Sequence, residues 1–78
     1  METKGQFRVQ IRKWGEPYTE PALYYGEEPY VAPSVGEDIY IDKEDGGLEH
    51  YVVVKKETII STRAGHRLYL MMIYVKEP

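Results

Sequence analysis

The segment QFRVQIRKW (Gln6–Trp14) alternates apolar and polar side chains, and it decides the fold class of this chain. Phe7, Val9 and Ile11 share one face, while the polar side chains between them share the other. A period of two is typical of a β-strand with one buried face, whereas a helix needs apolar residues three and four positions apart. The segment therefore predicts a half-buried strand.

Four further segments have the composition of strands, and no window has the periodicity of a helix. Lys55–Glu57 interrupts the longest of them and predicts a bulge or bend there. Asp42–Gly47 has the residues of a tight turn, and Arg63–His66 predicts a longer hairpin loop. The strands are expected at 22–25 as a short edge strand, at Ile39–Ile41, at His50–Val54 continuing through Thr58–Thr62, and at Leu68–Val75.

These strands predict an all-β fold, a small antiparallel barrel or roll of four to six strands connected in sequence. A chain of 78 residues is one domain with a thin core, so residues 1–78 form a single barrel with a long acidic Tyr/Pro-rich loop at 15–36. The absence of cysteine excludes disulfides and thiolate zinc sites. Stability must therefore come from apolar packing or from a second copy of the chain.

Three segments together resemble the small Src-homology-3-like barrel proteins of bacteria and phages. They are Pro33–Ile41, which contains a Val-Gly-acid entry into an alternating strand, Tyr51–Val54 and Leu70–Val75. The resemblance covers residues 33–75 and implies an SH3-like barrel. It assigns no functional residue. Separately, the small size, the lack of catalytic groups and the acidic aromatic loop resemble those of phage-encoded inhibitors of host defence or nucleic-acid-processing proteins, and this analogy implies such an inhibitor.

The net charge of −3 is very unevenly distributed. From Glu16 to Glu49 there are ten acids and one base, whereas residues 1–15 and 50–78 each carry +3. The acidic segment also holds tyrosines, which supply rigid contact area, while acids steer encounters with basic surfaces. We therefore predict a non-catalytic protein that docks on a basic surface of another protein through Glu16, Tyr18, Glu20, Tyr24, Tyr25, Glu27, Glu28, Tyr30, Glu37 and Asp38. In the alternative interpretation, the acids keep a long loop solvated while the tyrosines pack on the barrel.

Two other functions compete with this one. Arg8, Arg12 and Trp14 share the outward face of the first strand, and Lys55 and Lys56 extend this basic set. Basic side chains with an aromatic ring on a sheet face are typical of sites for nucleic acid or nucleotide. Separately, Leu68–Val75 is apolar on both faces, so the face that does not fill the barrel needs cover from the long loop or from a twofold partner in an oligomeric assembly subunit.

Residues suited to catalysis or metal binding are few. His50 and His66 lack the spacing of zinc ligands, and Asp42–Gly47 fails the calcium-loop pattern because Gly46 and Val53 fall at ligand positions. We expect no enzyme activity, no cofactor and no metal. No apolar run follows Met1, and the eight apolar residues Leu68–Val75 are far short of the ~20 that a membrane helix needs, so we expect a cytoplasmic protein.

Overall fold

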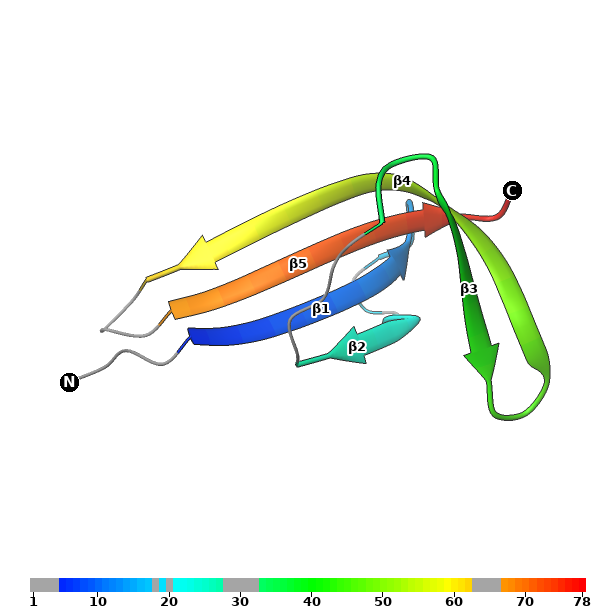
Figure 1. Cartoon of the computed structure of the whole chain (residues 1–78), viewed down its shortest axis with the longest axis horizontal. Helices are drawn as coiled ribbons and strands as arrows, with labels where there is room; N and C mark the ends of the chain where they lie inside the picture. The colour runs from blue at the N-terminus through cyan, green and yellow to red at the C-terminus, as the bar shows by residue number, and fades with distance from the viewer. Residues whose placement is uncertain (1–4, 18, 20, 28–32, 63–66) are drawn as a thin grey trace.

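Five β-strands and no helix make up the part of the chain that the structure, a computed structural model, describes: residues 5–17, 19, 21–27, 33–62 and 67–78. The strands form a single sheet (Figure 1). Their bounds are β1 Gly5–Lys13, β2 Tyr24–Gly26, β3 Asp38–Lys43, β4 Gly47–Ser61 and β5 Arg67–Lys76. The predicted all-β class is confirmed, and each predicted strand is present. The predicted loop Arg63–His66 lies outside the described residues.

The strand order is β2-β1-β5-β4-β3, which is not the order of the chain. The expected antiparallel pairing holds for β1 with β2, β3 with β4, and β4 with β5. The expectation that every pair is antiparallel and sequential is wrong for β1 and β5, which run parallel side by side. Sequence patterns locate strands but do not name their neighbours, and here the β3-β4-β5 meander brings its last strand against the first.

The central strand, β5, is the one with apolar residues on both faces. Ile73 and Val75 are fully buried on the concave face of the sheet, and Met72 and Tyr74 are also buried, on the outer face. A strand with neighbours on both sides and cover on both faces reads as a continuous apolar run. At the end of the outer face of β5, the ring of Trp14 packs edge-on against Tyr74 at 5.4 Å between centroids, whereas Leu68 and Leu70 on the same face are only half-buried.

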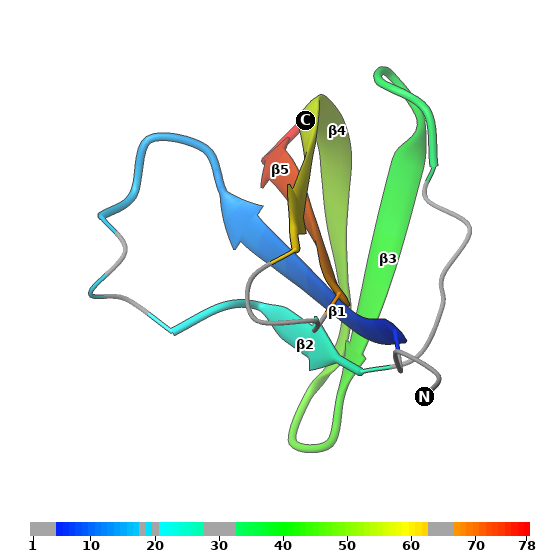
Figure 2. The ribbon, with the colours of Figure 1, turned by 90° about the vertical axis from the view of Figure 1, so that its left-hand side faces the viewer.

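The sheet curls into a half-barrel around one hydrophobic core. Figure 2 shows this curl, which brings the edge strands β2 and β3 round the concave side. The predicted inward face of β1 is confirmed in the centre of the sheet, where Val9 is 2% exposed and Ile11 4%. The core comprises Val9, Ile11, Tyr51, Val53, Ile73 and Val75.

A bulge in β4 lets one long strand serve both halves of the sheet. The register with β5 shifts between Val53 and Lys55, directly before the predicted interruption at Lys55–Glu57, whose residues pair regularly with β5. Before the bulge β4 pairs with β3, and after it β4 continues along β5 to Ser61. A bulge bends its strand and increases the local twist, as the path of β4 in Figure 1 shows. The tight turn before β4 is also confirmed, with Gly47 at φ 103°, a conformation that favours glycine.

At one end, the sheet narrows to three strands and extends away from the core (Figure 1). β2 pairs with β1 only at Val9–Ile11, and β3 pairs with β4 only as far as Val52. We call the three-stranded part beyond them the arm; it consists of residues 5–8, 58–61 and 67–70. The arm contributes to an elongated shape of 45 × 25 × 24 Å.

Candidate functional site

Six of the ten residues predicted to bind a partner are described, and they fall into separate groups. Tyr24, Tyr25 and Glu27 belong to β2 and the residue after it, whereas Glu37 and Asp38 lie at the start of β3. Glu16 follows β1 and lines a surface hollow beside Trp14 instead. The remaining four, Tyr18, Glu20, Glu28 and Tyr30, lie outside the described residues.

The two larger groups lie on the two edge strands, and a cavity opens between those strands. Its volume is about 380 Å³, and it is lined by Ile11, Tyr24, Ile39, Tyr40, Ile41 and Asp42. We call this cavity the edge groove. It is the opening of the half-barrel, because β2 and β3 are the two ends of a sheet that curls toward closure (Figure 2).

The walls of the edge groove are apolar and aromatic. Ile39 and Ile41 are half-buried against the core, whereas Tyr24 and Tyr40 are 45% and 59% exposed. Tyr40 is held by a stack on the His50 ring at 4.6 Å between centroids. His50 in turn lies 2.7 Å from a carboxylate oxygen of Asp38, measured from its Nε2. This stack lies on the face of β3 opposite to Ile39 and Ile41, so it holds the strand that forms one wall of the groove from its other side.

The strand along this wall also has unpaired backbone groups. Among the described residues, β3 pairs only with β4. An antiparallel strand uses alternate residues to bond each neighbour, so half of the N–H and C=O groups of β3 point to its open edge. Such an edge is a template for another extended chain.

Carboxylates dominate the charge around β3. From Glu37 to Asp45 the chain carries five acids and one base, and all six side chains are exposed. The base, Lys43, is 3.0 Å from Glu49 and so is already paired. The free edge of the sheet therefore presents a negative field.

Sequence reasoning missed the apolar half of this groove. Ile39, Tyr40 and Ile41 were assigned to a short strand, with no expectation that it would be an edge with one wall open. The available signal was a strand with large apolar side chains on both faces, since Ile39 and Ile41 alternate with Tyr40. Only the topology shows that this strand has no second neighbour among the described residues.

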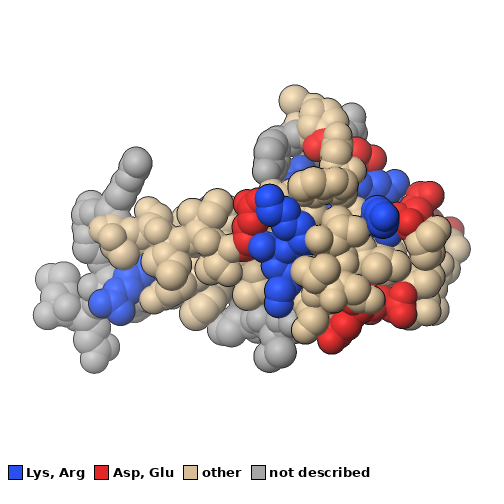
Figure 3. All heavy atoms as spheres, turned by 90° about the horizontal axis from the view of Figure 1, so that it is seen from above, with Lys and Arg blue, Asp and Glu red and all other residues tan. Residues whose placement is uncertain are grey.

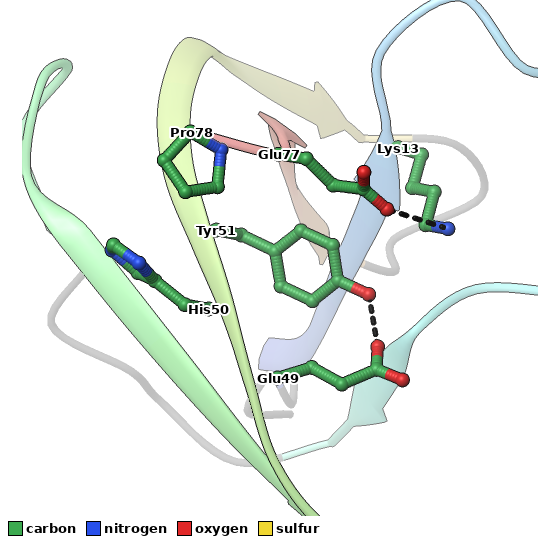
Figure 4. A pocket seen from close by; sticks show the side chains of 6 residues that line it. All are labelled: Lys13, Glu49, His50, Tyr51, Glu77 and Pro78. Carbon is green, nitrogen blue, oxygen red and sulfur yellow. Dashed lines mark hydrogen bonds and ion pairs between the residues drawn. The ribbon is translucent and has the colours of Figure 1, made fainter.

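A second cavity, of about 440 Å³, lies beside residues 49–51 of β4 and is polar (Figure 4). The hydroxyl of Tyr51 donates a hydrogen bond to the carboxylate of Glu49. The same carboxylate forms an ion pair with Lys43. Lys13 lies 3.9 Å from Glu77 and 5.9 Å from the centroid of the Tyr51 ring. The cavity is lined by Lys13, Glu49, His50, Tyr51, Glu77 and Pro78.

The hydrogen bond between Tyr51 and Glu49 shifts the pKa values of the two groups in opposite directions. It raises the pKa of the Tyr51 phenol to about 12, with burial of the group as the second cause. It also lowers the pKa of the Glu49 carboxyl, helped by the hydrogen bond from Lys43. At neutral pH, the pair is a neutral donor facing a charged acceptor. This arrangement suits a positioning role, in which a core ring and a charged rim hold each other in place.

We expect these two groups to shape the pH dependence of stability. The folded pKa of Tyr51 is raised, so its contribution is complete below pH 10 and is lost as pH rises from about 10 to about 12. The folded pKa of Glu49 is lowered, so its contribution is present above 4.5 and is lost as pH falls below that value. Urea unfolding across this pH range measures both limbs.

Two variants provide the controls for this profile. Tyr51→Phe should flatten the alkaline limb, and Glu49→Gln should reduce both limbs because it removes the charged acceptor. An alkaline limb that is unchanged in Tyr51→Phe would show that other groups cause it.

Four of the five residues predicted to bind nucleic acid share one face of the sheet, and the fifth does not. Arg8, Arg12, Trp14 and Lys55 lie on the outer face of the sheet. Lys56 pairs in register with Ile73 and so lies on the opposite face, which corrects the prediction that it extends the set. The sequence alone does not show on which face of the sheet each of these lysines lies, because the bulge before Lys55 shifts the alternation of side chains along β4.

Two of the described bases on the outer face, Arg12 and Lys55, also have partners within the chain. Arg12 donates from Nε to the side-chain oxygen of Gln10 at 2.9 Å. Lys55 pairs with Glu57 at 3.0 Å and lies 5.5 Å from the Trp14 ring centroid. Figure 3 shows both signs of charge intermixed on one face of the body and few charges on the arm. The charge blocks along the sequence therefore do not become two opposed faces in that view.

Metal-ligand clusters and membrane-spanning helices are both absent from the part of the chain that the structure describes. No three of the described His, Asp or Glu side chains gather closely enough to hold a metal ion. Among the described residues, no helix has the length and apolar character needed to cross a membrane.

Comparison with known proteins adds no relative. No family model, no curated protein and no solved structure matches this chain.

Proposed function

We propose that this chain is a non-catalytic binding protein that takes up an extended, basic segment of another protein in the edge groove. The observation that carries the proposal is the groove itself: an apolar and tyrosine-lined cavity between two edge strands. The proposal retains the predicted basic protein partner. It narrows the contact surface from a long acidic segment to the walls of this groove.

The backbone supplies the first part of the interaction. The open edge of β3 offers alternating donors and acceptors over its six residues, Asp38–Lys43. An extended peptide can add to such an edge as a further strand, so that main-chain hydrogen bonds provide affinity. Pockets for alternate side chains then provide specificity.

The side chains supply the second part. Tyr24 and Tyr40 expose large rings next to the half-buried Ile39 and Ile41. Tyrosine is enriched among the residues that dominate binding energy, because it combines a large contact area with a hydroxyl. An apolar side chain of the partner can therefore sit between the ring of Tyr24 and the half-buried Ile39 and Ile41, while the ring of Tyr40 offers contact area on the other face of β3.

The charge supplies the third part. Asp42 lines the groove, and the acids Glu37 and Asp38 lie at the start of the same strand. Acids that surround an apolar groove raise the rate of encounter with a basic segment and disfavour acidic ones. The favoured ligand is therefore a strand in which Lys or Arg alternates with aliphatic residues.

The test uses two synthetic peptides, one of alternating Lys and Val and one of alternating Glu and Val, titrated into ¹⁵N-labelled protein. We expect the Lys-Val peptide to shift the amides of β3 and to bind more tightly than the Glu-Val peptide. Asp42→Lys should weaken binding of the Lys-Val peptide by about fivefold, because an exposed attraction becomes a repulsion. Glu16→Lys makes the same charge change outside the groove and should have a smaller effect.

Three results would overturn the proposal. They are equal binding of both peptides, an effect of Glu16→Lys as large as that of Asp42→Lys, and slow hydrogen exchange of every β3 amide in the free protein. The last result would mean that the chain's own residues already pair with this edge.

A further inference from the structure

The arm has a free strand edge that is separate from the edge groove. Beyond the bulge, β4 pairs with β5 from Lys55 to Ser61, while its pairing with β3 ends at Val52. Among the described residues, no strand lies on the other side of β4 over Lys55–Ser61. β5 offers no such edge, because β1 and β4 pair with its two sides.

Apolar side chains reach this free edge on both faces of the arm. On the concave side, Ile60 lies opposite Tyr69, whose ring stacks on Phe7 at 5.0 Å between centroids. On the outer side, Ile59 lies opposite Leu70. Ile59 is 49% exposed and Ile60 is 61% exposed. Each row of apolar side chains therefore ends in an exposed isoleucine at an unpaired edge.

The chain as a whole exposes more surface than a compact monomer of the same mass. The chain exposes 6026 Å², whereas a compact monomer of 9.1 kDa exposes about 4,900 Å². The excess of about 1,100 Å² is comparable with the ~800 Å² that each partner buries in a standard interface. The radius of gyration is 14.1 Å, against about 11.5 Å for a compact domain of this length.

We propose that the free edge of β4 pairs with the same edge of a second copy of this chain. Antiparallel pairing of a strand with its own copy is compatible with a twofold axis, which makes the interface self-complementary. The two three-stranded arms then become one continuous sheet. At the axis, the exposed isoleucine that ends each row is covered by a side chain of the partner copy.

Charge disfavours some registers of this pairing and permits others, of which an axis at Thr58 is one. An axis at Lys56 would place the two copies of that lysine directly opposite each other, which is destabilising. An axis at Thr58 places Lys56 opposite Ile60 of the second copy and Glu57 opposite Ile59. In that register the long stem of Lys56 covers an isoleucine, and no two like charges are opposed.

The first test measures mass against concentration by light scattering. We expect the chain to move from 9.1 kDa toward twice that mass as its concentration rises through the micromolar range. Ile60→Lys should raise the dimer dissociation constant by about 100-fold, because each change occurs twice in the interface. Leu48→Lys is the matched control, since Leu48 is 67% exposed on the other half of β4, and it should leave the constant unchanged.

The second test reads the register and does not depend on a lysine being tolerated. Because the chain has no cysteine, Thr58→Cys introduces a single thiol. We expect it to form a disulfide-linked dimer on mild oxidation, whereas Leu48→Cys should stay mainly monomeric. A monomer at high micromolar concentration would overturn the proposal. A dimer that Ile60→Lys leaves intact and Thr58→Cys does not crosslink would overturn it equally.

Discussion

Replacing Ile73 with alanine is expected to lower the free energy of unfolding by about 2–5 kcal/mol. Ile73 is fully buried at the centre of the core, where β5 lies between β1 and β4. The change removes apolar contacts and leaves a cavity that neighbours on three strands cannot easily fill. A domain of this size has a total stability of only about 4–12 kcal/mol, so this single change can leave the fold marginal. Urea unfolding at one fixed protein concentration measures the loss.

Leu48→Ala is the control for this prediction. It removes as many carbon atoms as Ile73→Ala, but from a side chain that is 67% exposed next to the turn before β4. Its effect should stay within about 0.5 kcal/mol. Equal losses in the two variants would mean that burial in the half-barrel is not what stabilises the chain.

The second large effect is expected at Tyr51, whose ring and hydroxyl have separate roles. The ring is 2% exposed in the core, and the hydroxyl donates to Glu49 at its rim. Tyr51→Ala should therefore cost about 3–5 kcal/mol, in the range found for buried aromatic residues. Tyr51→Phe keeps the ring and removes one hydrogen bond to a charged but partly exposed acceptor, so about 1 kcal/mol should be lost.

An exposed tyrosine provides the comparison. Tyr40 is 59% exposed and stacks on His50, so Tyr40→Ala should cost far less than Tyr51→Ala in the same unfolding experiment. If Tyr51→Phe were as damaging as Tyr51→Ala, the hydroxyl rather than the ring would be the main source of stability. That result would contradict the account of the core given above.

The strands could be predicted because each of them has a recognisable pattern within its own few residues. The alternation of Phe7, Val9 and Ile11 needs no distant partner to be interpreted, since a period of two follows from the pleat of a strand. The turn at Asp42–Gly47 could be predicted for the same reason, because Asp and Gly favour turns through their own backbone geometry. The charged residues at Lys55–Glu57 likewise predicted an interruption, and the bulge in β4 lies directly before them.

The candidate site was only half predictable. Composition points to Tyr24, Tyr25, Glu37 and Asp38, and the structure places Tyr24, Tyr25 and Asp38 on the two edge strands and Glu37 directly before β3. The groove between those strands depends on which strands end the sheet. That choice is a competition among pairings across the whole chain, in which the β1 partner of β5 comes from the opposite end of the sequence.

The number of charges in each segment is a property of the sequence, whereas their positions on the surface depend on the fold. The sequence alone established how many acids and bases each segment carries, but not which surface they occupy. Lys55 and Lys56 are adjacent in the chain and yet lie on opposite faces, because successive side chains in a strand alternate. Ion pairs such as that of Lys43 with Glu49 also neutralise charges locally, whereas a count along the chain treats each charge as independent.

What the sequence determined by itself is the all-β class, the positions of the strands and turns, and the inward face of β1. These follow from local sterics and from the period of two, which act within a few residues. Only the tertiary structure decided that β5 is central, that β2 and β3 bound a groove, and that β4 ends in an arm with a free edge. These depend on which distant strands bury the most apolar surface together, and that is a property of the whole chain.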